Sequence, residues 1–215
     1  MKTINWTFGS LLLLASSGIA LAQAERPGGT ALGAKTTITV PLERADKSAA
    51  ALDAQREKRA LQVFLKSVRT QIVPAADAMP AVKYGFAPTD GEFKGVRTFG
   101  QQVKHLAATN YILAAAALGD EPPAGAGDEM GPETVRTKAE ILDYLNGSFE
   151  YLGKAIDAIG DKNTTVKSSP ISPLKSTETT RLALTVEAMI HAFDHYGQMV
   201  EYLRMNGIVP PASRP

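Results

Sequence analysis

Residues 177 to 211 read TETTRLALTVEAMIHAFDHYGQMVEYLRMNGIVPP, a stretch with the apolar periodicity of one long helix. Gly207 supplies a left-handed stop. The apolar pair that follows it can pack back onto the last turn, and two prolines then prevent the helix from continuing. His191 and His195 are four residues apart, so their imidazoles project from the same side of the helix. This spacing is typical of a metal-chelating pair.

Three earlier stretches repeat apolar residues at intervals of three and four, as amphipathic helices do. The first starts near Ser48 and ends at Pro80, and Pro74 inside it predicts a kink or a restart. The apolar stripe of this helix consists of Leu61, Phe64, Leu65, Val68, Ile72, Ala75 and Met79.

Capping boxes mark the starts of the next two predicted helices. In Thr98-Phe99-Gly100-Gln101 the threonine oxygen and the glutamine side chain can satisfy free amides at a helix start, and we expect this helix to stop at Gly119. Thr137-Lys138-Ala139-Glu140 repeats the signature and opens a helix for which we expect Gly160 as the stop.

Four amphipathic helices without a convincing strand pattern predict an all-α fold, an antiparallel-type four-helix bundle over residues 48–211. Residues 119–134 are rich in glycine, proline and acidic residues, which predicts a long loop. Connections of this length allow a crossover, so the order of the helices around the bundle stays open. Residues 23–47 predict a flexible arm with at most a short extended piece at 36–40.

The first 22 residues have the features of a secretory signal peptide: a positive start at Lys2, an apolar run, and Ala20-Leu21-Ala22 as the cleavage site. We therefore expect a secreted or periplasmic protein that is not embedded in a membrane. Removal of Lys2 leaves 22 basic and 22 acidic residues, and no basic run stands out. This balance argues against nucleic acid as a partner and favours a small-molecule ligand. A homodimer is compatible with the sequence.

The remaining histidine, His105, lies in the second predicted helix. If the bundle packs that helix against the one with His191 and His195, three imidazoles can bind one divalent ion and leave a position for water or substrate. Zinc or nickel are the metals we expect, with iron, manganese or copper as alternatives. Ala192 stands where HExxH metalloproteases carry their glutamate base, so the sequence lacks that motif.

A pair of solvated histidines is the competing interpretation, because such pairs also occur by chance. At about 100° per residue the histidines fall nearly opposite the main apolar stripe of their helix. We expect that stripe to consist of Leu182, Val186, Met189, Phe193 and Val200. Either this helix is covered on two sides, or the histidines line a cleft at one end of the bundle. Glu187 and Gln198, one turn before and one turn after the pair, are candidates to hold the free imidazole nitrogens.

From about Ala60 to Pro211 the chain resembles the DinB/YfiT-like superfamily. The residues that carry the resemblance are Ala78-Met79-Pro80, Tyr84-x-Phe86-x-Pro88, Val96-Arg97-Thr98-Phe99-Gly100, His105, His191-x3-His195-Tyr196-Gly197-Gln198, Tyr202-Leu203-Arg204 and Gly207-Ile208-Val209-Pro210-Pro211. The final motif is the most specific of these, and no departure occurs at the histidines.

The resemblance implies a four-helix bundle in which His105, His191 and His195 hold a divalent metal. It also implies a thiol transferase or isomerase, in which the metal activates a small-molecule thiol. A metal-dependent hydrolase and a metal-binding module without turnover are the alternatives. Export weakens the thiol interpretation, because low-molecular-weight thiols are kept reduced mainly in the cytosol.

Overall fold

The computed structural model describes residues 42–89, 91, 94–160, 165–172 and 177–215. The expected signal peptide, and the expected arm up to residue 41, lie outside these ranges. The rest of the arm is helical, because the first helix, α1, begins at Leu42 rather than near Ser48. Residues 42–47, LERADK, contain mostly good helix formers and no glycine or proline, so nothing local delays the helix until Ser48.

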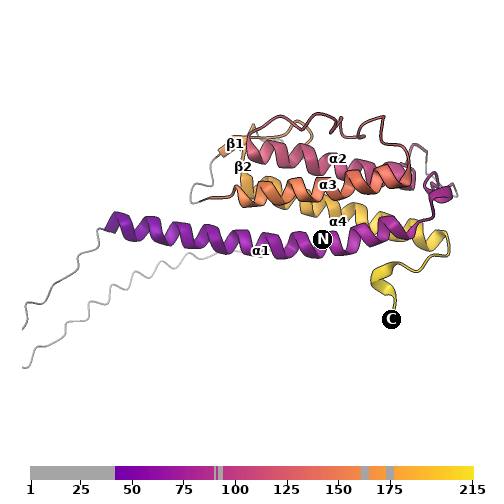
Figure 1. Ribbon diagram of the computed structural model, residues 1–215, viewed down its shortest axis with the longest axis horizontal. Helices are drawn as coiled ribbons and strands as arrows, with labels where there is room; N and C mark the ends of the chain where they lie inside the picture. Colours follow the sequence, from indigo (N-terminus) through magenta and orange to yellow (C-terminus); the bar gives the residue numbers. More distant parts are fainter. Residues whose placement is uncertain (1–41, 90, 92–93, 161–164, 173–176) are drawn as a thin grey trace, which may run out of the picture. The chain divides into compact units, whose positions relative to one another are not determined.

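Four helices build the described part of the chain: α1 (Leu42–Ala78), α2 (Phe99–Leu118), α3 (Lys138–Asp157) and α4 (Arg181–Met205). Figure 1 shows them side by side as a bundle, which confirms the predicted all-α class. Two single-turn 3-10 helices, Ala81–Lys83 and Pro211–Ser213, follow α1 and α4. Within the described ranges, no helix is long and apolar enough to span a membrane.

Two short strands, β1 (Thr165–Lys167) and β2 (Glu178–Thr180), form an antiparallel pair between α3 and α4. Thr165 lies opposite Thr180 in this pair. Thr180 is the last residue of β2 and also caps α4, so the strand leads directly into the helix. We did not expect these strands, because three residues are too few to show an alternating pattern.

The helix order, which the sequence left open, is α1–α3–α2–α4 around the bundle. Helix α2 packs against α3 and α4, and α1 packs against the same two helices from the other side. Residues 119–137 cross the length of the bundle, so α2 and α3 run in the same direction, whereas α2 and α4 are antiparallel (Figure 1). This crossover brings the loop back over the start of α2.

The core contains most of the apolar stripe predicted for α1, but not Phe64. Val68, Ile72 and Met79 are fully buried, whereas the side chain of Phe64 is 59% exposed. The face of α1 that α3 and α4 cover is narrower than the predicted stripe, and Phe64 falls outside it. The helix also continues through Pro74 without restarting.

Both predicted capping boxes are present. Thr98 Oγ1 accepts a hydrogen bond from the backbone amide of Gln101 at 3.3 Å, and the same reciprocal pattern opens α3. The predicted stops at Gly119 and Gly207 are confirmed, since both have left-handed backbone angles. Gly160 is not a helix stop. Helix α3 ends at Asp157, and Ala158 closes it in a right-handed conformation, so no glycine is required there.

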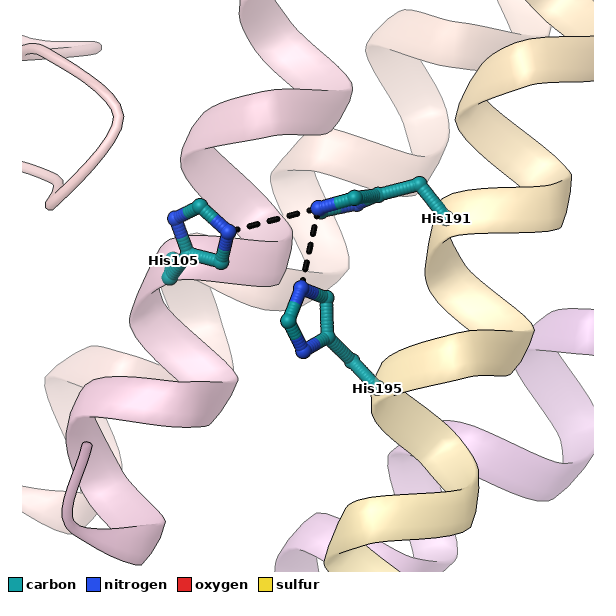
Figure 2. A group of neighbouring side chains, drawn as sticks. All are labelled: His105, His191 and His195. Atoms are coloured by element: carbon teal, nitrogen blue, oxygen red, sulfur yellow. Dashed lines mark hydrogen bonds between the residues drawn. The ribbon is translucent and has the colours of Figure 1, made fainter. Parts of the chain in front are cut away.

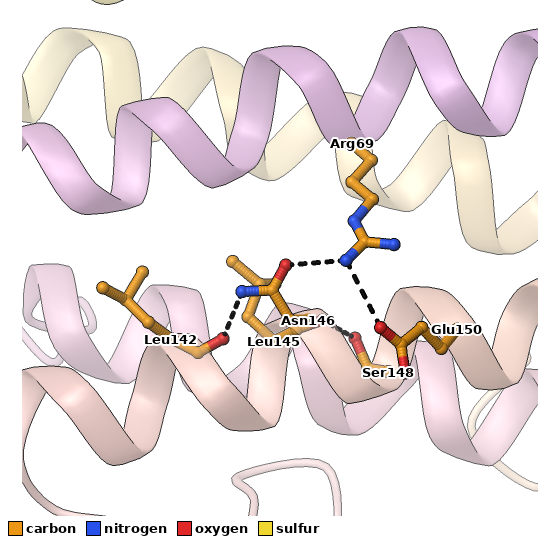
Figure 3. A network of polar contacts seen from close by, with 6 residues as sticks. All are labelled: Arg69, Leu142, Leu145, Asn146, Ser148 and Glu150. Carbon is orange, nitrogen blue, oxygen red and sulfur yellow. Dashed lines mark hydrogen bonds and ion pairs between the residues drawn. The ribbon is translucent and has the colours of Figure 1, made fainter.

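Helices α1 and α3 are also joined by a polar network (Figure 3). The Nη2 atom of Arg69 donates to Asn146 Oδ1 at 3.0 Å and contacts Glu150 Oε1 at 3.5 Å. The amide of Asn146 in turn donates to the carbonyl of Leu142 at 3.0 Å. This network links the two helices by side-chain contacts outside the apolar core.

Candidate metal centre

The three histidines meet between α2 and α4 (Figure 2). His105 comes from α2, and His191 and His195 project from successive turns of α4. The Nε2 atom of His191 lies 3.3 Å from Nε2 of His105 and 2.9 Å from Nε2 of His195. The three candidate ligand atoms all lie within 4.8 Å of one another. Two nitrogens that share an ion through bonds of ~2.1 Å lie at most ~4.2 Å apart. Both distances to His191 meet this limit, and the third pair, within 4.8 Å, meets it after at most a small inward shift.

The histidine face of α4 is its buried face, which corrects the predicted stripe. Residues on that side, including Leu184, Ala192 and Met199, are fully buried. Of the predicted stripe only Met189 is buried, at 6% exposure; Phe193 is 41% exposed, and Leu182, Val186 and Val200 are partly buried. The pattern of large apolar residues misled the prediction, because α2 packs on the side of α4 that carries the histidines and buries smaller residues there, such as Ala188 and Ala192, beside Leu184 and Met199.

The outer nitrogens of two histidines have partners from α2 and from the crossover loop. His105 Nδ1 donates to the backbone carbonyl of Glu129 at 2.5 Å. The amide nitrogen of Gln102, a residue with 2% exposure, donates to His195 Nδ1 at 2.8 Å and to Gln198 Oε1 at 2.5 Å. His191 Nδ1 is buried and has no hydrogen-bond partner.

The two residues expected to hold the imidazoles therefore take different positions. Gln198 reaches His195 only through Gln102, and its own amide donates to Asp194 at 3.0 Å. The carboxylate of Glu187 accepts a hydrogen bond from Ser172 Oγ at 2.9 Å rather than holding an imidazole nitrogen. Gln102, rather than Gln198, donates to the outer nitrogen of His195, because it lies three residues before His105 and across the helix interface from His195. A search of the sequence for polar residues three or four positions from His105 would have found it.

The histidines are held in the neutral form that binds metals. Burial, followed by the neighbouring imidazoles, lowers the pKa of His191 to about 3. Burial likewise lowers the pKa of His195 to about 4 and shifts that of His105 below its ordinary value. Neutral imidazoles offer a lone pair to a cation without first losing a proton.

The hydrogen bonds around the cluster test whether these residues fit a metal ion. A carbonyl can only accept, so His105 carries its proton on Nδ1 and directs the lone pair of Nε2 at the other rings. His191 Nε2 contacts the Nε2 atoms of both His105 and His195. A ring nitrogen carries either a proton or a lone pair, so His191 Nε2 cannot donate to His105 and also accept from His195. A central cation removes this conflict, because it accepts all three lone pairs. The donor set therefore fits a divalent metal.

A cavity of about 370 Å³ opens beside the histidines. Its size falls within the ~300–1,000 Å³ typical of small-molecule sites. The polar and charged residues of the wall are Arg97, His105, Thr109, Glu129, Glu187, His191 and Asp194. A second cavity of about 390 Å³ shares Ile171 with the first one. The open side of the cluster thus faces space that a small molecule can enter.

Arg97, Thr109 and Glu129 were not among the predicted site residues. Arg97 belongs to a motif that carried the family resemblance, and Thr109 lies one turn after His105. Glu129 reaches the site only because the crossover loop returns over α2, and no local sequence signal shows this.

The comparisons with known proteins agree with this arrangement. A family model described as the DinB superfamily matches residues 65–199, a range that contains all three histidines and α2, α3 and most of α4. No curated protein matches the chain.

Proposed function

The chain belongs to the DinB superfamily, and we propose that it is a metal-dependent enzyme with one divalent ion held by His105, His191 and His195. The observation that carries the proposal is the convergence of three neutral imidazoles beside a cavity of small-molecule size. Structural metal sites usually have four protein ligands, whereas three ligands leave a position for a reacting group. Zinc or nickel suit such a site, and iron, manganese or copper are the alternatives.

A bound metal ion of this kind lowers the pKa of a coordinated thiol or water, which makes a nucleophile near neutral pH. We assign Glu187 as the residue that takes the released proton. It lines the same cavity, and burial raises the pKa of its carboxyl above the ordinary value, which makes it a stronger base. The hydroxyl of Ser172 orients one carboxylate oxygen and leaves the other available.

The reaction class depends on the nucleophile. A thiol would attack an electrophilic small molecule in a transfer or isomerisation reaction, and water would hydrolyse an ester or amide. We further propose that the protein is exported, as its first 22 residues indicate, and that its partner is a small molecule rather than nucleic acid.

The proposal is tested first by metal analysis of protein purified without an affinity tag. We expect close to one divalent ion per chain in the wild type, and a similar loss of metal in His105→Ala and His191→Ala. The matched control for His105→Ala is Gln71→Ala. Gln71 lies on α1 and hydrogen-bonds only within its own helix among the described residues. Unchanged metal content in His105→Ala would refute the three-histidine site.

Activity is tested with the metal-loaded protein on two panels, thiols with electrophiles and esters or amides with water. Turnover that requires metal and decreases in Glu187→Gln, while metal content is kept, supports the enzyme. Metal binding without turnover on either panel would support the alternative function, a non-catalytic metal-binding module.

A further inference from the structure

Arg97 lies at the edge of the metal site, next to the start of α2 and in contact with α4. It immediately precedes Thr98, the residue that caps α2. Its carbonyl accepts a hydrogen bond at 3.1 Å from the hydroxyl of Tyr202 on α4, and the ring of Tyr202 packs edge-on against Phe86. The backbone that carries this arginine is therefore fixed relative to both helices that supply the histidines.

The guanidinium of Arg97 lies in the wall of the cavity, and no residue in the described part of the chain gives it an anionic partner. Its Nη2 atom contacts only the thioether sulfur of Met130, at 3.6 Å, which is a weak acceptor. Its Nε atom is buried and has no hydrogen-bond partner. Among residues with a described placement, no carboxylate lies within ion-pair distance of this side chain.

The two poorly satisfied atoms, Nε and Nη2, form one edge of the planar guanidinium. This edge presents two parallel N–H groups, whose spacing matches the two oxygens of a carboxylate. A half-buried cation of this kind gains most from an anion that enters the cavity, because a buried donor without an acceptor costs free energy.

We propose that the cavity binds a small organic acid whose carboxylate is held by the Nε and Nη2 atoms of Arg97, beside the three-histidine cluster. This inference rests on the proposed enzymatic function, because the metal is what would act on the other end of the bound acid. Arg97 would fix the orientation of the substrate, so it is a specificity-determining residue.

The rest of the wall favours a single orientation for such an acid. Glu129, Glu187 and Asp194 also line the cavity and would repel a carboxylate, so Arg97 marks the one cationic end. Ile171 lines both this cavity and the second one, whose wall includes Ile112, Ala116 and Pro170. An apolar chain on the acid can extend in that direction.

The hydroxyl of Thr109 supplies a second anchoring point in the cavity. The residue is 3% exposed, and its Oγ1 atom is buried without a partner. Arg97 precedes the capping residue of α2, His105 follows on the helix, and Thr109 lies one turn further on. A ligand that starts at Arg97 and runs along this helix therefore meets a cation, the metal ligands and then an unpaired hydroxyl, which can bind a polar group distant from the carboxylate.

The test uses full-length protein, loaded with zinc or treated with a chelator, and titration calorimetry with hexanoate and the neutral 1-hexanol. We expect hexanoate to bind the wild type saturably and Arg97→Ala roughly 10-fold or more weakly, with partial recovery in Arg97→Lys. Arg69→Ala, which removes an arginine between α1 and α3, is the matched control and should bind hexanoate as the wild type does. Hexanol should not distinguish wild type from Arg97→Ala.

Equal hexanoate affinity in wild type and Arg97→Ala would overturn the inference, as would no binding to the wild type. Circular dichroism shows whether Arg97→Ala is folded. If it is not, Arg97→Lys, which keeps the positive charge, is compared with the wild type for hexanoate affinity instead. Hexanoate binding that depends on Arg97 but persists without metal would support the anion site even if the metal-dependent function failed. Binding that requires zinc but not Arg97 would instead assign the carboxylate to the metal.

Discussion

The amide nitrogen of Gln102 lies 2.8 Å from Nδ1 of His195, so α2 contacts the outer edge of a ring that α4 supplies. In this orientation the amide donates to Nδ1, and the proton of the neutral imidazole then lies on Nε2. Metal binding needs the opposite tautomer, with the proton on Nδ1. A half-turn of the Gln102 amide would present its oxygen to that proton. It would also turn that oxygen toward Gln198 Oε1, so the Gln198 amide has to turn with it and gives up its hydrogen bond to Asp194.

We therefore expect Gln102→Leu to weaken metal binding by roughly 10- to 100-fold, the usual effect of losing a hydrogen bond to a metal-bound histidine. Competition with a chromogenic chelator measures the affinity. Gln71→Leu on α1 serves as the control for a glutamine outside the site. Wild-type affinity in Gln102→Leu would show that the ring of His195 is oriented by packing alone.

The stability of the metal-free protein should depend on pH through its buried histidines. The pKa of His191 is about 3 and that of His195 about 4 in the folded state, against ~6.5 for an unfolded chain. Between the folded and unfolded pKa values the unfolded state binds more protons than the folded state. The free energy of unfolding should therefore fall as the pH is lowered from about 6.5 to about 4. Urea unfolding at several pH values measures this slope. The double variant with His191→Gln and His195→Gln should show a shallower slope, and an equal slope would contradict the assignment.

The loop that carries Glu129 should be sensitive to Gly127. This glycine has a φ of +74°, and an added Cβ would lie 2.6 Å from the backbone nitrogen of Pro132. Gly127→Ala should therefore cost more than the ~1–2 kcal/mol of a left-handed non-glycine residue, and it should also weaken metal binding by displacing the loop from His105. Gly125→Ala is the matched control, because Gly125 has a φ of +86° and open space around the added atom. Chemical denaturation and metal titration of both variants give the comparison.

Two phenylalanines test the corrected core. Phe149 on α3 is 1% exposed, whereas Phe64 on α1 is 59% exposed. Phe149→Ala should lower the free energy of unfolding by about 3–5 kcal/mol, the range for a buried phenylalanine. Phe64→Ala should have a much smaller effect, measured by the same urea titration. Similar losses in the two variants would mean that the exposed side of α1 is covered in solution.

Local signals in the sequence determined much of the fold. The helix starts at Thr98 and Thr137 and the stops at Gly119 and Gly207 follow from hydrogen bonds and backbone angles within a few residues. The end of α3 was not predicted correctly, because a helix can also end without a glycine, as at Ala158. The three histidines were identifiable because a helix places residues four apart on one side.

Only the tertiary structure decided which side of α4 is covered, where α2 lies, and what surrounds the histidines. Periodicity shows which residues share a helix face, but the neighbouring helices determine which face is buried, and Phe193 consequently lies outside the core. The contacts of Gln102 and Glu129 with the histidines join residues that are 93 and 24 positions apart. Such contacts depend on how the crossover loop and the helices pack, and sequence periodicity does not record that packing.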